Sequence, residues 1–570
     1  MPRLARDRLE RGIHLVAWGV ALALGLLQVW VHRYSMSIDG VSYLDIAVNL
    51  SERDWEHAVT GHWSPLFPAV IAVVLAIARP SYSWEFPLVH AVELAIYVGA
   101  LAAFTLLLAE LLRLRDRDSA ELDGSMLSRA LLLVLGYATF AWTTLALINL
   151  YAVTPDLLLA GLLYLAAAML VRIRRGAAGI PTWVLLGIAL GLGYLAKTVL
   201  FVVAPALLAA AYIASRDRAT ARMRLALAIV LWLAISVPWI ALLSTDKGRL
   251  TIGDTARDTY VYEVGGLPYR HWQGDVPGFG EPLHPTRLIY PDPPVYEFRE
   301  PVDGTYPVGY DPSYWYDGVQ IAFSLKRQIL AIYRSLFAYL PVVDIFLLSW
   351  LVLFIAGIRR RSDLGRPFTA YGFLLLPAVF ALLLYAIVYV QPRYIAGFWT
   401  LAVLALMLGV RLPQSELTAR VFRAGVLATV LILGARLCLM TAAELQRALD
   451  PPKDWIWSSA EGLRTMGVEP GTRVAWIGAT FNPAWARLAR VQIVVEIPVE
   501  HAERYWSTDA EIRDEILETF VAAGAEVVYA SSVPFWAPTG DWTYLGLMNT
   551  GRHLARRLHV QETEGSPRAP

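Results

Sequence analysis

The sequence predicts an α-helical polytopic membrane protein with about eleven transmembrane helices, followed by a C-terminal extracytoplasmic α/β domain. Hydrophobic residues make up 57% of the 570 residues and charged residues only 17%, and the apolar residues lie in long runs. Runs of about 18 or more apolar residues are typical of helices that span a bilayer. After residue 450, short β-branched runs replace the long apolar ones, which predicts a soluble domain.

The N-terminus carries four arginines before an apolar segment that extends from Ile13 to about Val31. This segment is too long for the core of a signal peptide, so we expect an uncleaved first helix. The net charge of +1 gives no basic field that would favour a nucleic-acid partner. The single cysteine, Cys438, excludes an intramolecular disulfide.

Clusters of basic residues predict the topology, because cytoplasmic loops are enriched in Lys and Arg. The clusters are the N-terminus, Arg113–Arg129, Arg172–Arg175, Arg216–Arg224, Arg359–Arg361 and Arg411–Arg423. Since all these clusters are expected on the same side, the chain must cross the membrane an even number of times between any two of them. The predicted helices are 12–31, 86–109, 130–149, 156–172, 181–196, 199–215, 225–244, 337–357, 368–390, 394–411 and 421–441. We expect a multi-pass protein of a bacterial inner membrane, with a cytoplasmic N-terminus and an extracytoplasmic C-terminus.

The even number of crossings decides whether two ambiguous segments span the membrane. Pro65–Ala78 is apolar but reaches only about 21 Å as a helix, short of a hydrocarbon core about 30 Å thick. We expect a juxtamembrane or re-entrant helix there. Pro181–Ser215 has basic clusters on both sides and is too long for one helix, so it predicts a hairpin of two short helices broken at Lys197, at the outer turn.

The chain divides into a transmembrane domain over 1–449 and an extracytoplasmic domain over 450–570. Loops 34–64 and 244–326 also face outward. The longer loop contains many tyrosines and prolines, and its aromatic content is too high for a disordered segment. It is either a functional lid or binding surface, or a cap over helix ends.

The C-terminal segment predicts a parallel α/β unit. Strands are expected at Val474–Ile477, Ile493–Ile497 and Val527–Tyr529, and helices near 455–466, 508–523 and 543–557. No GxGxxG spacing follows the first strand, so a structural or acceptor-guiding role is favoured over nucleotide binding.

Two carboxylates lie at outer helix ends. Asp39, followed by Gly40, comes directly after the first helix and is well placed to act on a membrane-bound substrate. Asp-Gly is also a common turn dipeptide. Asp156 follows Thr154 and Pro155, a pattern that by itself marks the start of a helix.

Two cations face the same side. Lys197 lies within an apolar hairpin and Arg393 precedes Tyr394 at the outer start of a helix. Charges so placed either serve function or reach toward the interface as anchors. Together with the carboxylates they would suit a phosphate-bearing donor, because arginine binds phosphate in a bidentate manner and lysine acts as a point charge.

The order of these motifs resembles the GT-C superfamily of membrane glycosyltransferases, in particular the branch of protein O-mannosyltransferases and lipid A aminoarabinose transferases. The resemblance spans about residues 10–410. The matching elements are Asp39-Gly40 with Tyr43, Ser64–Pro68, Thr154–Asp156, the glycine-rich run Gly187–Lys197, and Arg393-Tyr394.

The resemblance implies transfer of a sugar from a polyprenyl-phosphate donor to a protein, lipid or glycan acceptor on the outer face of the membrane. By position, Asp39 would be the general base, Arg393 and Lys197 would hold the lipid phosphate, and Asp156 would help bind a metal or the sugar. The residues expected to line the cavity or bind substrate are Tyr43, His62 and Tyr394. Many relatives have paired acidic residues where this chain has Asp39-Gly40, a departure that argues against a shared metal site. No cofactor and a divalent cation such as Mg or Mn both stay open.

Two other functions are open. A transporter or lipid flippase also combines broken helices with intramembrane charges, although usually near the midplane and in two related halves. A non-enzymatic scaffold in envelope glycan assembly is the third reading, with the C-terminal unit as a docking module.

Overall fold

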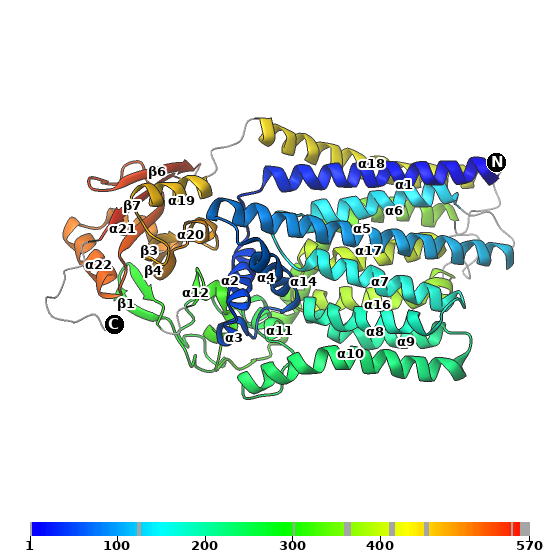
Figure 1. Ribbon diagram of the computed structural model, residues 1–570, viewed down its shortest axis with the longest axis horizontal. Helices are drawn as coiled ribbons and strands as arrows, with labels where there is room; N and C mark the ends of the chain where they lie inside the picture. The colour runs from blue at the N-terminus through cyan, green and yellow to red at the C-terminus, as the bar shows by residue number, and fades with distance from the viewer. Residues whose placement is uncertain are drawn as a thin grey trace.

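The computed structural model describes residues 3–121, 127–299, 303–357, 366–409, 416–449, 455–548 and 551–558. A bundle of long helices runs along the longest axis, and a unit built on a β-sheet lies beyond one end of the bundle (Figure 1). The predicted basic cluster Arg359–Arg361 and the residue Arg411 lie outside the described residues.

The bundle confirms an α-helical multi-pass membrane protein. Its helices are α1 (Arg3–Val31), α5 (Tyr82–Glu121), α6 (Arg129–Trp142) with the π-helix η1 (Thr143–Ile148), α7 (Asp156–Arg174), α8 (Ile180–Ala196), α9 (Val199–Ala214), α10 (Arg218–Asp246), α14 (Leu325–Gly357), α16 (Arg366–Val388), α17 (Pro392–Gly409) and α18 (Glu416–Leu449). Within the described residues, seven helices are long and apolar enough to cross a membrane, and α8, α9 and α17 contain shorter apolar stretches. Each predicted span overlaps one of the bundle helices given above. The predicted break between α8 and α9 lies at Lys197.

Three short helices, α2 (Ile38–Glu52), α3 (Trp55–Ala58) and α4 (Leu66–Ala78), lie at the end of the bundle next to the sheet unit (Figure 1). The predicted short helix after Pro65 is therefore confirmed as α4. The turn reading of Asp39-Gly40 is wrong, because both residues belong to the first turn of α2. The Ser37 side chain accepts a hydrogen bond from the Gly40 backbone N–H, as an N-cap residue does.

Segment 244–326 adds short elements beside these helices. They are α11 (Thr255–Thr259), η2 (Tyr260–Val264), the hairpin of β1 (Arg287–Pro291) and β2 (Pro294–Glu297), α12 (Pro307–Tyr310) and α13 (Pro312–Trp315). The hairpin joins the C-terminal sheet, because β2 pairs with β4 (Gln492–Pro498) in antiparallel fashion. Segment 244–326 and the C-terminal residues therefore build one sheet.

That sheet has seven strands in the order β1-β2-β4-β3-β5-β7-β6. As predicted, β3 (Arg473–Ala479), β4 and β5 (Val527–Val533) are parallel. The predicted helix near 543–557 is wrong, since this stretch forms the antiparallel pair β6 (Thr543–Met548) and β7 (Gly551–Arg557). Its Leu, Met, Ala and Arg residues favour helix locally, but Leu554 and Ala555 are buried where β7 pairs with β5.

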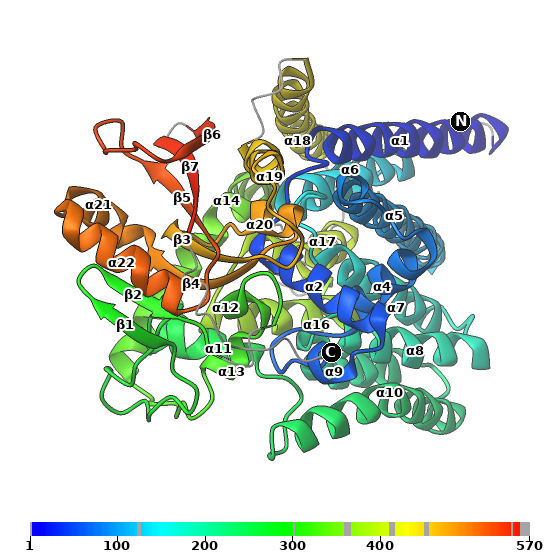
Figure 2. The same cartoon turned by 60° about the vertical axis from the view of Figure 1, so that its left-hand side comes forward.

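Helices cover both faces of the sheet (Figure 2). They are α19 (Trp455–Thr465), α20 (Ala484–Ala489), α21 (Val499–Ser507) and α22 (Ala510–Ala522). Residues of α19 and α20 share an apolar cluster with the central strands, which includes Trp476 and Trp485 and continues into Leu44 of α2 and Phe67 of α4. A second cluster holds α21 and α22 to the other face. The sheet unit is therefore packed directly on the short helices that carry Asp39.

Candidate active site

An ion pair joins the predicted base to the predicted phosphate-binding arginine. Arg393 Nη2 donates a hydrogen bond to Asp39 Oδ2 at 2.6 Å, although the two residues are 354 positions apart in the chain. Asp39 lies in the first turn of α2 and Arg393 in the first turn of α17. Both side chains stay partly exposed, at 23% and 17%. The pair is therefore open to a ligand.

A second ion pair continues from the first. Lys197 Nζ donates to Asp156 Oδ1 at 2.5 Å, and Asp156 Oδ2 lies 3.9 Å from Arg393 Nε. The Asp156 side chain is 1% exposed, so its charge depends on these two cations. The Tyr394 ring lies beside both cations, with its centroid 3.7 Å from Lys197 Nζ. The structure thus brings together Asp39, Arg393, Asp156, Lys197 and Tyr394.

This arrangement is made from helix ends. The first turns of α2, α7 and α17 meet at the ion pairs, and Lys197 lies in the break just before α9 begins. Free N–H groups and the helix dipole give the amino end of a helix a partial positive charge. Four such ends and two side-chain cations surround two carboxylates, which favours the binding of a further anion.

Tyr43 lies on α2 one turn after Asp39, and its ring packs edge-on against Trp63 and Phe67. Burial raises the pKa of Tyr43 well above its ordinary value, and the nearby carboxylates Asp39 and Asp156 raise it further. Its hydroxyl is therefore neutral and can donate a hydrogen bond. Tyr43 therefore lies close enough to Asp39 and Asp156 to feel their charges.

His62 contacts a different partner. Its Nδ1 lies 2.9 Å from Asp258 Oδ2 of α11, and both side chains are buried. Burial raises the pKa of Asp258, while its hydrogen bond to His62 opposes that shift. His62 reaches Tyr43 only through Trp63, whose ring packs against both. It fixes the long outer segment beside the site instead of contacting the ion pairs.

Sequence reasoning missed the residue that holds the loop before Asp156. Glu93 of α5 is buried, and its Oε1 accepts a hydrogen bond from the Thr154 backbone N–H at 2.8 Å. The loop contains Val153 at φ 56°, a conformation that is costly for a β-branched residue. A carboxylate inside an apolar helix was the available signal, since such residues are functional candidates by default.

A divalent cation is the cofactor that the family resemblance implies for this site. Asp39 and Asp156 each already bind a side-chain cation, and within the described residues no group of three or more His, Cys, Asp or Glu side chains could hold a metal ion. A divalent cation therefore stays a prediction of the resemblance, and no step below depends on it.

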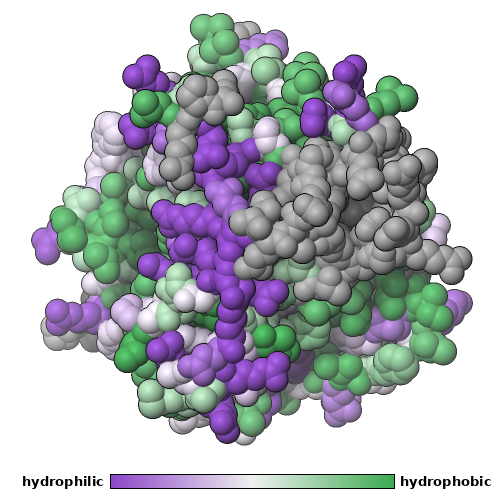
Figure 3. Space-filling view, turned by 90° about the vertical axis from the view of Figure 1, so that its right-hand side faces the viewer, coloured by the Kyte–Doolittle hydropathy of each residue, from purple (hydrophilic) through white to green (hydrophobic). Residues whose placement is uncertain are grey.

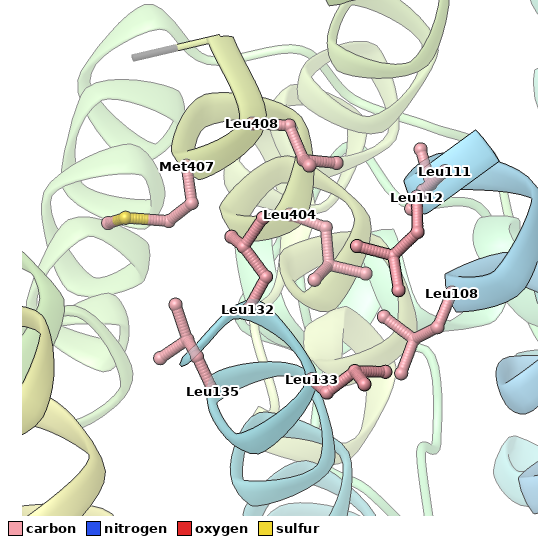
Figure 4. Close-up of a pocket in the computed structure, with 9 residues that line it drawn as sticks. All are labelled: Leu108, Leu111, Leu112, Leu132, Leu133, Leu135, Leu404, Met407 and Leu408. Carbon is pink, nitrogen blue, oxygen red and sulfur yellow. The ribbon is translucent and has the colours of Figure 1, made fainter. Parts of the chain in front are cut away.

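A pocket inside the bundle offers no chemistry. It lies between α5, α6 and α17, is lined by eight leucines and Met407 (Figure 4), and has a cavity volume of about 10 Å³. That is roughly the space of one water molecule, with no polar group to bind it. The candidate site is thus distinct from this packing defect.

No family model matches the chain, and no curated protein matches it. Among solved structures, ArnT from Cupriavidus metallidurans in the apo state is 14% identical, with a TM-score of 0.47 over 96% of this chain and 98% of that one. The same protein bound to undecaprenyl phosphate is 13% identical, with a TM-score of 0.47 over 95% and 97%. The apo oligosaccharyltransferase of Archaeoglobus fulgidus is 13% identical, with a TM-score of 0.46 over 91% and 69%.

Proposed function

We propose that this protein is a glycosyltransferase that moves a sugar from a polyprenyl-phosphate donor to an acceptor on the extracytoplasmic face of a bacterial inner membrane. The observation that carries the proposal is the line of ion pairs Asp39–Arg393–Asp156–Lys197 at the amino ends of helices. Cations and helix ends stabilise a phosphate. A partly exposed carboxylate beside them can accept a proton.

In the proposed reaction, an acceptor oxygen or nitrogen forms a bond to the anomeric carbon of the sugar. The bond between that carbon and the phosphate oxygen breaks at the same time, and its electron pair stays on the lipid phosphate. The acceptor proton passes to Asp39. Attack from the face opposite the phosphate inverts the anomeric carbon.

The cations make the lipid phosphate a leaving group that needs no proton. Arg393 has five N–H donors, so it can bond the phosphate while releasing Asp39, and Lys197 can share its three donors between Asp156 and the phosphate. Tyr394 and Tyr43 lie near these charges and would offer hydroxyl donors to the sugar. Asp156 then serves to hold the cations in place.

A transfer assay in liposomes tests the proposal. Sugars attached to undecaprenyl phosphate, the lipid in one neighbouring structure, are offered with protein, lipid and glycan acceptors. The expected result is free undecaprenyl phosphate in equal amount to the transferred sugar. Movement of an intact donor across the bilayer without cleavage would instead establish the transporter or flippase alternative.

A further inference from the structure

An arginine-rich cavity lies at the opposite end of the bundle from the candidate active site. It has a volume of about 500 Å³ and lies between the ends of α5, α7, α8 and α10 and the loops that join them. Five arginines line it: Arg113, Arg117, Arg175, Arg216 and Arg224. Helix α7 separates it from Asp156 by about 27 Å at 1.5 Å per residue. It is therefore a separate site.

The carboxylates nearby do not balance these charges. Glu110 binds Arg113 at 2.8 Å and Arg175 at 2.9 Å. Asp217, which also lines the cavity, accepts hydrogen bonds from backbone N–H groups in the first turn of α10. Arg216 and Arg224 form no ion pair with any carboxylate that the structure describes. Among the described residues, the lining of the cavity therefore holds five arginines and one carboxylate.

Two of the arginines that line the cavity each keep one buried N–H group with no acceptor among the described residues. Arg224 donates to the Ala178 carbonyl at 3.1 Å, but its Nε is buried and has no hydrogen-bond partner among the described residues, and the same holds for Arg175 Nε. Leaving a buried donor unpaired costs about 1–3 kcal/mol, and more for a charged group. The described protein groups therefore do not satisfy all the donors of these two arginines.

The tendency of arginines to collect in cytoplasmic loops explains their number at this end of the bundle, but not their enclosure of a cavity. The buried ring of Trp183 and the side chain of Ile173 line the same space. Seen from this end, hydrophilic residues form a band across the bundle (Figure 3). Basic pockets between helices at this level of a membrane are suited to phosphate head groups.

We infer that this cavity binds an anionic phosphate group, supplied either by the head group of an acidic phospholipid or by a soluble diphosphate. Arg117 and Arg216 are the residues to test, because both lie next to Gly176 at the rim. Arg218 and Arg222 provide a matched control, since they are exposed arginines on α10 at the same end but do not line the cavity.

The experiment compares three full-length proteins in detergent: wild type, the double variant Arg117→Gln/Arg216→Gln, and the control Arg218→Gln/Arg222→Gln. Each is titrated with cardiolipin, with phosphatidylcholine and, separately, with inorganic pyrophosphate, and binding is followed by native mass spectrometry and thermal unfolding. We expect wild type and control to bind cardiolipin or pyrophosphate alike, and the cavity variant to bind about tenfold more weakly. The ligand that binds identifies the source of the phosphate.

Equal affinity in all three proteins would overturn the inference, as would an equal loss in the control, because surface charge alone would then explain binding. Binding of phosphatidylcholine as tight as that of cardiolipin would also contradict it. If the double variant fails to fold by circular dichroism, the single change Arg216→Gln replaces it, since Arg216 forms no ion pair with a described residue.

Discussion

At the scale of single residues, the buried carboxylate of Asp156 depends on Lys197. Removing one partner of a buried pair leaves the other charge uncompensated, which costs about 3–5 kcal/mol. Because Arg393 lies 3.9 Å away and Lys197 is partly exposed, we expect Lys197→Met to lower the free energy of unfolding by about 3 kcal/mol. The double change Lys197→Met/Asp156→Asn should recover most of this loss while transfer stays abolished. Chemical unfolding in detergent measures the first effect, and a single variant as stable as wild type would contradict the account.

Glu93 acts on the site through the loop that it holds. Glu93→Gln keeps an oxygen acceptor for the Thr154 N–H, whereas Glu93→Ala removes it and lets the strained loop at Val153 relax. We expect the alanine variant to lose about tenfold in kcat, because Asp156 shifts away from the cations, and the glutamine variant to keep most of it. Initial rates at saturating donor test this. Equal rates in the two variants would show that the hydrogen bond does not position Asp156.

At the scale of elements, the close approach of α2 to the loop before α7 brings Asp39 to the other charges. A Cβ on Gly40 would lie 2.5 Å from Met36 Cγ and 2.9 Å from the Ala152 carbonyl oxygen. Gly40→Ala must therefore push α2 from the loop, at a cost of about 1–3 kcal/mol, and transfer should fall at least tenfold. Gly99→Ala in α5 is the control, since a Cβ there meets nothing within 4 Å. Thermal unfolding and transfer rates that are equal in both variants would contradict this.

The spans could be predicted because a bilayer demands long apolar runs, and charges at their outer ends stand out against such a background. This is why Asp39, Asp156, Lys197, Arg393 and Tyr394 could be placed on one face and are found in contact. Pairings between distant segments could not be predicted. Strand β2 meets β4 through Tyr296 and Glu496, two hundred residues apart, and no local pattern marks either partner.

The start of α2 beside Asp39 is marked by a signal in the sequence. Ser37 is a good N-cap residue, and the apolar stretch that follows it is helical in length. The Asp-Gly dipeptide outweighed that signal because it is common in turns. The family resemblance implies that His62 lines the cavity, which stays a prediction. Its ion-pair partner Asp258 belongs to segment 244–326, and no local sequence pattern predicts that contact.

At the scale of the whole molecule, one arginine joins the sheet unit to the helices. Arg487 of α20 binds Asp45 of α2 at 3.0 Å and Glu85 of α5 at 2.8 Å, and all three side chains are largely buried. The Thr305 backbone N–H also donates to Asp45, so the long outer segment meets the same point. The sheet unit is therefore held firmly above the candidate site.

Removing this arginine should release the sheet unit. Arg487→Met leaves the buried Asp45 carboxylate without a cation and leaves Glu85 with only Arg490, whose Nη2 lies 3.6 Å from Glu85 Oε1. We expect the free energy of unfolding to fall by about 3–5 kcal/mol. Arg504→Met is the control, since the Arg504–Asp292 pair is exposed and such pairs contribute about 0–1 kcal/mol. Limited proteolysis between the two parts should cut only the Arg487 variant faster. Equal cleavage would mean that apolar packing alone holds the unit.

Asp45 also makes stability depend on pH. Burial raises the pKa of Asp45 from 3.8 to about 6, against the opposing effect of Arg487. Between pH values of about 4 and 6, the folded protein therefore binds more protons at Asp45 than the unfolded chain does. The contribution of Asp45 to stability falls as the pH rises through this range and is constant above about pH 6. Asp45→Asn should flatten that part of the profile of Tm against pH. An unchanged slope in the variant would contradict the assignment.

The proposed glycosyl transfer depends above all on proton transfer to Asp39 during cleavage of a lipid-linked sugar. The most direct test compares single-turnover rates of wild type, Asp39→Asn and the control Asp246→Asn, whose carboxylate is exposed near the outer end of α10. With the donor identified by the liposome assay, we expect Asp39→Asn to slow sugar transfer by at least about 10²-fold while still binding the donor, because a general base contributes about 10²–10⁴-fold. The control should match wild type. Sugar transfer by Asp39→Asn at the wild-type rate would contradict the role of Asp39 as the general base.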